Sequence, residues 1–134
     1  MRKYKRSDTD RKAGMLIREG KNVYNLKERT FLFAKRMLEI SELLPSSATC
    51  NVIRIQLIKS GTSIGANIEE ADGAFTRPDF RNKMVIARKE AREVNYWLRL
   101  VAEKYLEPEV LANDIQESHE LIKIFSSIIS KVKA

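Results

Sequence analysis

The sequence contains a single cysteine, Cys50, and a single histidine, His119. A lone cysteine excludes a disulfide within the chain, and the cysteine spacing that is typical of zinc sites is absent. A lone histidine also excludes the two Glu-x-x-His motifs on which di-metal four-helix bundles depend. We therefore expect no metal, no cofactor and a reducing compartment, and the sequence favours the cytoplasm.

Catalytic motifs are missing as well. Cys50 is expected near the start of a helix, where the helix dipole lowers the pKa of a thiol, but the sequence places no histidine near it. A buried structural thiol is the commoner role of such a residue. No glycine-rich phosphate loop follows a strand, because no strand is evident. We expect a protein with no catalytic residues that is not an enzyme.

Two acidic residues, Glu90 and Glu93, fall on one stripe of a predicted helix. Paired carboxylates inside a bundle can bind two metal ions, but the histidines that complete such a site are missing. We expect both carboxylates to be partly buried and to form salt bridges with Arg54, with Lys59 or with another subunit.

Long hydrophobic runs are also absent. Near the basic N-terminus the longest run is Met15 to Ile17, which is too short for a signal-peptide core or a membrane span. The apolar faces of the helices are needed for packing, so a membrane-surface protein fits poorly. We predict a soluble, cytoplasmic protein without membrane contact.

Glycine and proline are scarce, with five and three residues, so long segments are free to form helices. Pro45, Pro78 and Pro108 stand where an apolar period stops or restarts, and the last two suit the first turn of a helix. Four amphipathic helices are predicted, at about residues 24–44, 47–75, 78–105 and 109–132. Ser46 or Ser47 is expected to cap the second.

Apolar residues in each helix recur at alternating spacings of three and four, which defines a buried seam. The seam residues are Leu26, Thr30, Phe33, Met37, Ile40 and Leu44; Leu57, Gly61, Ile64, Ile68, Ala71 and Phe75; Phe80, Met84, Ala87, Ala91, Val94, Leu98, Val101 and Tyr105; and Leu111, Ile115, Ser118, Ile122, Phe125, Ile129 and Val132. Short connections between long helices imply antiparallel neighbours. The predicted fold is an all-α, up-down-up-down four-helix bundle over residues 23–134, preceded by a basic arm at 1–22.

Several helices carry apolar residues outside these seams. They are Phe31, Leu38, Ile53, Trp97, Leu100, Leu121, Ile124 and Ile128. Some of this surplus can widen the apolar face of each helix, but it more readily suggests association of several copies.

Positive charge is concentrated in two zones of a chain whose net charge is +7. The first is the arm, with Arg2, Lys3, Lys5, Arg6, Arg11 and Lys12. The second is a stripe on the third helix, with Arg81, Arg88, Arg92, Asn95 and Arg99. Such a stripe can follow nucleic-acid phosphates. The alternative is a solvated helix face with pairs such as Lys89 to Glu93.

Residues 60–74 read SGTSIGANIEEADGA, and helical spacing places small and polar residues on adjacent stripes. The residues of interest are Ser60, Gly61, Ser63, Gly65, Asn67 and Glu70. Small residues let a second backbone approach closely, and hydroxyl and amide groups can then bond across the contact. The contact is either a helix crossing within one bundle or an interface between subunits.

The stretch Ser63 to Ala71, SIGANIEEA, resembles the SIxANIxEG signature of the four-helix-bundle family that includes 23S rRNA intervening-sequence-encoded proteins. Residues 57–62 and 80–101 are similar to the neighbouring parts of that family. The resemblance covers roughly residues 22–132. It implies a bacterial, ribosomal protein-like bundle that assembles as a homopentameric ring and associates with large-subunit ribosomal RNA. Related bundles are accessory proteins to the reverse transcriptases of diversity-generating retroelements.

Two functional hypotheses follow. The first is a non-enzymatic, ring-forming module that binds structured RNA, such as 23S rRNA, through the arm and the arginine stripe. The second is a protein-interaction scaffold, or an accessory factor for a partner such as a reverse transcriptase.

Overall fold

The structure is a computed structural model that describes residues 26–133. Four helices account for most of this range: α2 (Leu26–Leu43), α3 (Ala48–Asp72), α4 (Arg77–Lys104) and α5 (Pro108–Lys131). The predicted arm lies outside the described residues, and with it Arg2, Lys3, Lys5, Arg6, Arg11 and Lys12.

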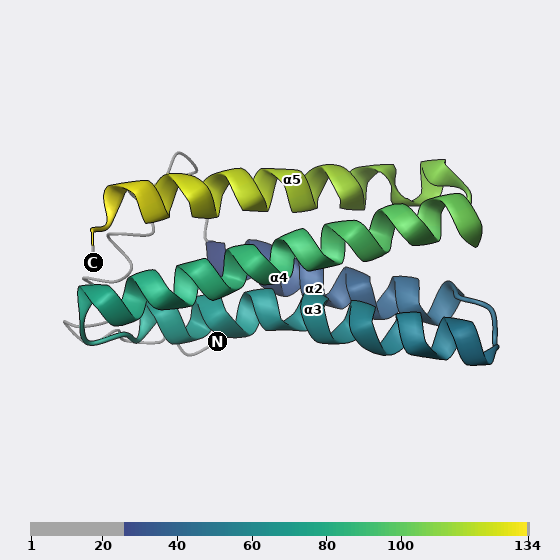
Figure 1. The fold of residues 1–134 in the computed structure, drawn as a ribbon, viewed down its shortest axis with the longest axis horizontal. Helices are drawn as coiled ribbons and strands as arrows, with labels where there is room; N and C mark the ends of the chain where they lie inside the picture. The colour runs from purple at the N-terminus through teal and green to yellow at the C-terminus, as the bar shows by residue number, and fades with distance from the viewer. Residues whose placement is uncertain (1–25, 134) are drawn as a thin grey trace, which may run out of the picture.

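The four helices run antiparallel to their neighbours in sequence and are joined by short turns (Figure 1). α3 packs against α2 on one side and α4 on the other, α4 packs against α5, and α2 and α5 touch only slightly. The predicted all-α, up-down-up-down bundle is therefore confirmed.

Side-chain caps set the start of two helices. The Ser47 hydroxyl accepts a hydrogen bond from the Cys50 amide, 3.1 Å away, and begins α3. Thr76 accepts from the Asp79 amide at 3.2 Å and begins α4, with Pro78 in its first turn. Each cap satisfies an amide that has no partner within its helix.

The second helix ends three residues earlier than the pattern suggests. α3 stops at Asp72, Gly73 follows as the C-cap, and the chain turns toward the Thr76 cap. Phe75, which the seam placed in the core, is 88% exposed in this turn. The prediction failed there because the hydrophobic spacing continues to Phe75, although the chain between Gly73 and Thr76 forms the turn.

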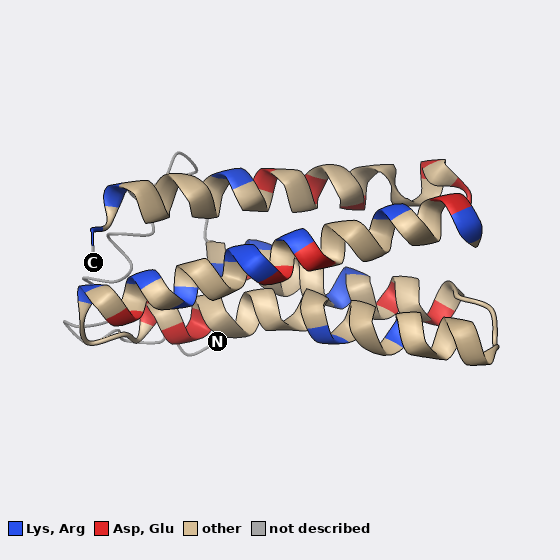
Figure 2. Cartoon of the chain, in the orientation of Figure 1, with Lys and Arg blue, Asp and Glu red and all other residues tan. Residues whose placement is uncertain are grey.

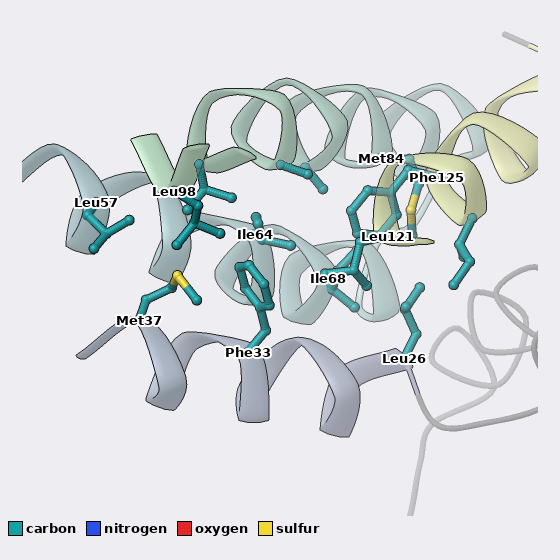
Figure 3. Packing of buried hydrophobic residues seen from close by; sticks show 14 of the residues in the cluster. Leu26, Phe33, Met37, Leu57, Ile64, Ile68, Met84, Leu98, Leu121 and Phe125 are labelled. Carbon is teal, nitrogen blue, oxygen red and sulfur yellow. The ribbon is translucent and has the colours of Figure 1, made fainter. Parts of the chain in front are cut away.

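The other seam residues line a continuous core. Every predicted seam residue of α2 and α4 is buried, except that Tyr105 at the end of α4 is half-buried. In α5, Ile115 and Ile122 are half-buried and the rest are buried. Figure 3 shows Phe33 and Met37 of α2 pointing toward Ile64 and Leu98 of the facing helices.

The surplus apolar residues divide into two groups. Ile53, Leu121, Ile124 and Ile128 are buried and widen the core. In contrast, Phe31, Leu38 and Leu100 remain exposed and Trp97 is half-buried. Only the second group therefore remains available for contact with another molecule.

Ion pairs close the edge between α2 and α5. Arg29 donates two hydrogen bonds of 2.7 Å to the Glu117 carboxylate. About two turns further along α2, Arg36 Nε lies 3.1 Å from Asp114 Oδ1. The Nη2 atom of Arg36 also donates to the Val110 carbonyl oxygen. The partly buried guanidinium groups of α2 thus have carboxylate partners and serve the fold.

Candidate nucleic-acid interface

The arginines predicted to form a stripe do lie along one side of α4, the side that borders α5. Arg88 Nη1 donates to Ser126 Oγ of α5 at 3.3 Å. Arg81 and Arg88 are half-buried, whereas Arg92 and Arg99 are exposed. At 1.5 Å per residue the stripe extends over about 27 Å. Figure 2 shows the blue basic segments spaced along α4.

Within residues 26–133, none of these four arginines forms a salt bridge. The pairing of Lys89 with Glu93, which the alternative interpretation invoked, is not formed in that range either. The contrast with Arg29 and Arg36, both bound to carboxylates, is marked. The arginines of α4 therefore keep donor groups that an anion from outside the bundle can use.

Asn95, which the pattern placed in this stripe, has a different role. It is only 5% exposed, and its Nδ2 donates to Ser118 Oγ of α5 at 2.8 Å. Its Oδ1 accepts from Arg99 Nε at 2.9 Å. Asn95 thus links α4 to α5 and holds one arginine of the stripe, rather than facing solvent.

Sequence reasoning overlooked an aromatic residue beside this stripe. Tyr96 is 50% exposed, and the Arg99 guanidinium carbon lies 5.9 Å from the centre of its ring. Trp97 packs edge-on against the same ring, with 5.1 Å between the ring centres. The available signal was an aromatic residue between Arg92 and Arg99, four and three residues away from them.

A surface pocket of about 390 Å³ opens next to Tyr96, where α4 approaches the start of α5. Its walls include Tyr96, Arg99 and Glu103 of α4, and Pro108 and Ile115 of α5. It therefore continues the arginine stripe toward the turn between the two helices.

The acidic pair on α4 behaves differently from what the sequence suggested. Glu90 is half-buried and Glu93 is exposed. Burial raises the pKa of the Glu90 carboxyl, and the charge of Glu93 and a hydrogen bond with it raise it further. Among the described residues neither carboxylate forms a salt bridge, and Arg54 donates instead to the carbonyl oxygens of Ser41 in α2 and of Leu44, which follows α2.

The glycines of α3 provide a close approach within one bundle. A Cβ atom added at Gly61 would overlap the Met37 side chain of α2 and would lie 2.9 Å from its Cβ. One at Gly65 would lie 3.4 Å from the Thr30 carbonyl oxygen, also of α2. For these two residues, the crossing inside the bundle is therefore the interpretation that the contacts support.

The hydroxyl and amide groups of Ser60, Ser63 and Asn67 bond within α3, whereas the acidic residues Glu69 and Asp72 pair with Lys27 of α2. Ser60 Oγ donates to the Gln56 carbonyl oxygen at 2.8 Å, and Asn67 Nδ2 donates to the Ser63 carbonyl oxygen at 2.8 Å. Ser63 Oγ likewise donates to a carbonyl one turn earlier, and Glu70 is exposed. Side chains of this kind reach their own helix more easily than a neighbouring one, so the expected cross-helix bonds are not seen.

The remaining residues that the sequence singled out are Cys50 and His119. Cys50 is fully buried, in agreement with a structural thiol. His119 is exposed on α5. In the part of the chain that the structure describes, no group of three histidine, cysteine or acidic residues is placed to hold a metal ion. Among the same residues, no helix combines the length and apolar character needed to cross a membrane.

The fold and this surface define a class of protein: a four-helix bundle with a stripe of arginines along one helix that meet no carboxylate within residues 26–133. A family model described as 23S rRNA-intervening sequence protein matches residues 23–127. The chain belongs to this family, as its signature stretch in α3 predicted.

A solved relative supports the assignment. The chain is 40% identical to a protein of unknown function from the S23 ribosomal protein family of Bacteroides thetaiotaomicron, whose crystal structure superposes with a TM-score of 0.73. The alignment covers 78% of this chain and 98% of that chain. No curated protein matches the chain.

Proposed function

We propose that this protein is a non-enzymatic module that forms a ring and binds structured RNA, such as 23S rRNA, through phosphate contacts along α4. The observation that carries the proposal is the set of four α4 arginines, which have no carboxylate partner among the described residues. Guanidinium groups held on one side of a rigid helix suit a row of phosphates. Membership of the 23S rRNA-intervening sequence family is consistent with an RNA ligand.

The positions of acidic residues support the same surface. Between Arg81 and Arg99, the acids of α4 are Glu90 and Glu93, which are not on the arginine stripe. The nearest acid along the stripe is Glu103, four residues beyond Arg99. A phosphate backbone can therefore follow the stripe without meeting a carboxylate.

Association of several copies would place several stripes on one particle. Phe31 and Leu38 of α2 and Val52 and Ile55 of α3 are 42–62% exposed in the isolated bundle. Exposed apolar residues on adjacent helices favour burial against another protein surface, here a second copy of the chain. A ring of such copies would bind a large RNA at several points, which raises its overall affinity.

The test is a salt titration of binding to a structured 23S rRNA fragment. The variant Arg88→Gln/Arg92→Gln removes two charges from the stripe, and Lys35→Gln/Lys59→Gln removes two exposed charges from α2 and α3. Each phosphate contact contributes about 0.7–0.9 to the slope of log K against log salt. We expect the first variant to lower the slope by about 1.4–1.8 per protomer in contact, and the second to leave it nearly unchanged.

Two results would overturn the proposal. If the wild-type protein does not bind the RNA at low salt, the module is not an RNA-binding protein. If both double variants reduce the slope equally, the RNA senses only net charge and the stripe has no particular role.

The scaffold hypothesis is favoured by one observation, the exposed apolar residues of α2 and α3. A heterologous protein could cover them in place of a second copy. Affinity purification from a nuclease-treated lysate separates the two functions: a stoichiometric protein partner that survives nuclease favours the scaffold, and loss of every partner excludes it.

A further inference from the structure

We infer that the pocket at the C-terminal end of the arginine stripe receives one unpaired nucleobase of the bound RNA. This inference rests on the proposed function, since it names what the RNA places at one point of that surface. The pocket is about 390 Å³ in volume, which falls within the range of about 300–1,000 Å³ typical of small-molecule sites.

Tyr96 is an exposed aromatic residue in the wall of this pocket. Half of this residue is accessible, and Trp97 packs against its ring edge-on, which limits the orientations that the ring can adopt. Unpaired bases stack on aromatic rings in single-stranded RNA recognition, and stacking tolerates every base because each has a π-face. Tyr96 therefore offers a stacking surface directly beside phosphate-binding groups.

Arg99, in the wall of the same pocket, is held in place by hydrogen bonds. Its Nε donates to Asn95 Oδ1 at 2.9 Å, and Asn95 in turn donates to the buried Ser118 hydroxyl at 2.8 Å. This chain of hydrogen bonds holds the guanidinium 5.9 Å from the centre of the Tyr96 ring. An arginine held in this way presents a planar cation to a base or a phosphate at little further cost in side-chain entropy.

The remaining walls of the pocket are mostly apolar. Among the described residues that line the pocket, Leu100, Pro108 and Ile115 are apolar, and Glu103 is the only one with a carboxylate. A phosphate would be repelled by Glu103, whereas a flat base would cover the apolar walls. A carboxylate accepts hydrogen bonds from amino and imino groups of a base, and guanine carries two such donors on its Watson–Crick edge while uracil carries one. The pocket thus favours guanine.

The occupant must be unpaired. Within a duplex, the two faces of a base are stacked and its Watson–Crick edge is paired, so neither Tyr96 nor Glu103 could reach it. A loop, bulge or single-stranded end of a structured RNA supplies a base that can enter while the flanking phosphates lie along α4.

The test uses two single-stranded RNAs of equal length and charge, seven uridines and the same heptamer with guanosine at its centre. Binding is measured at low salt, with emission from Trp97, the only tryptophan in the sequence, as a local readout next to Tyr96. We expect the guanosine heptamer to bind more tightly and to change the Trp97 emission more strongly.

Substitutions at Tyr96 and at Glu103 test the contribution of each residue to binding. Tyr96→Ala should weaken binding of both heptamers about fivefold or more, and Tyr96→Phe should retain it. Glu103→Gln removes a negative charge, so it should bind the uridine heptamer as well as the wild type or better while losing the preference for guanosine. Phe75→Ala, which removes an exposed aromatic residue at the opposite end of the bundle, should change neither value (Figure 1).

The outcomes distinguish this inference from the proposed function. If the wild type binds neither heptamer nor 23S rRNA, the proposed function fails. If it binds both heptamers equally, with Tyr96→Ala and Glu103→Gln unchanged, phosphate binding stands and the base pocket is refuted. A loss in Tyr96→Ala that Phe75→Ala reproduces would also refute it.

Discussion

Gly61 sets how near α3 can lie to α2. Its missing side chain leaves room for Met37, whose Cβ would be only 2.9 Å from an added Cβ atom. Glycine costs about 0.5–1 kcal/mol in a helix interior relative to alanine. The residue is tolerated here because the packing of Met37 against the α3 backbone offsets that cost.

We therefore expect Gly61→Leu to lower the free energy of unfolding by about 1–3 kcal/mol, because Met37 must shift and the core is overpacked. Urea unfolding followed by circular dichroism measures this change. Gly65→Ala is the control: its Cβ would contact the Thr30 carbonyl oxygen at 3.4 Å, so the variant should be near neutral. An unchanged stability of Gly61→Leu would refute the close approach.

Glu90 adds a pH dependence at a single residue. Burial, reinforced by Glu93, raises its pKa above the ordinary value of 4.5, while the charges of Lys89 and Lys59 act in the opposite direction. The folded state therefore prefers the protonated form. The associated stability is fully present below the unfolded-state pKa and is lost as the pH rises through the folded-state pKa.

Glu90→Gln should thus be more stable than the wild type at neutral pH, and the difference should vanish as the pH falls below the ordinary value. Urea unfolding at pH 3.5 and pH 7 tests the sign. Glu42→Gln, at an exposed carboxylate of α2, is the matched control. A Glu90→Gln variant that is less stable at neutral pH would show that the Glu90 carboxylate has a favourable partner in the folded state.

Among the helices, α2 and α5 touch only slightly, and ion pairs span the edge between them. Asp114 accepts from Arg36 with a side chain only 10% exposed. Hydrogen bonds to charged and partly desolvated groups contribute more than exposed ion pairs do. The slight contact between α2 and α5 therefore relies on a small number of polar groups.

A double-mutant cycle with Arg36→Ala and Asp114→Ala measures the coupling energy between these two side chains. We expect a coupling energy of about 1 kcal/mol or more, since these groups are partly shielded from water. The same cycle on Glu120 and Lys123, an exposed pair 3.8 Å apart on α5, should give about 0.5 kcal/mol or less. Equal coupling in the two cycles would mean that the α2–α5 pair gains nothing from its partial burial.

The whole bundle has two contrasting surfaces. The side between α4 and α5 carries the pocket and the arginines that form no salt bridge among the described residues, whereas α2 and α3 carry exposed apolar residues. Leu38 and Ile55 lie near each other along the bundle axis, as the hydrogen bond from Arg54 of α3 to the Ser41 carbonyl oxygen of α2 indicates. Under the proposed function, the first surface would bind RNA and the second would bind another copy of the chain.

If copies associate through α2 and α3, Leu38→Glu/Ile55→Glu should reduce the molar mass measured by light scattering to that of a monomer, because burying two carboxylates in an apolar contact is costly. Val110→Glu, at a residue of similar exposure on α5, should keep the oligomer. A wild-type protein that is already monomeric would contradict the ring.

Much of the fold could be predicted from local patterns in the sequence. The three-and-four spacing identified the buried residues of α2 and α4, since helix geometry directly determines which side chains share a face. The signature in α3 identified the family. Periodicity alone could not place Phe75, because a turn is set by caps and a C-terminal glycine rather than by the hydrophobic period. Periodicity also could not show that Asn95 is buried while Arg92 and Arg99 are exposed. A small rotation about the helix axis is enough to move a side chain from solvent into the α4–α5 contact.

The sequence by itself therefore determined the helices, their seams and the antiparallel order, because each follows from residues close together in the chain. Only the tertiary structure decided which charges are neutralised within the fold. Arg29 and Arg36 meet carboxylates that are 88 and 78 residues away in the sequence, respectively, while the arginines of α4 meet none in the described bundle. Pairing depends on which helix surfaces face each other across the bundle, and that information is absent from the spacing within any one helix.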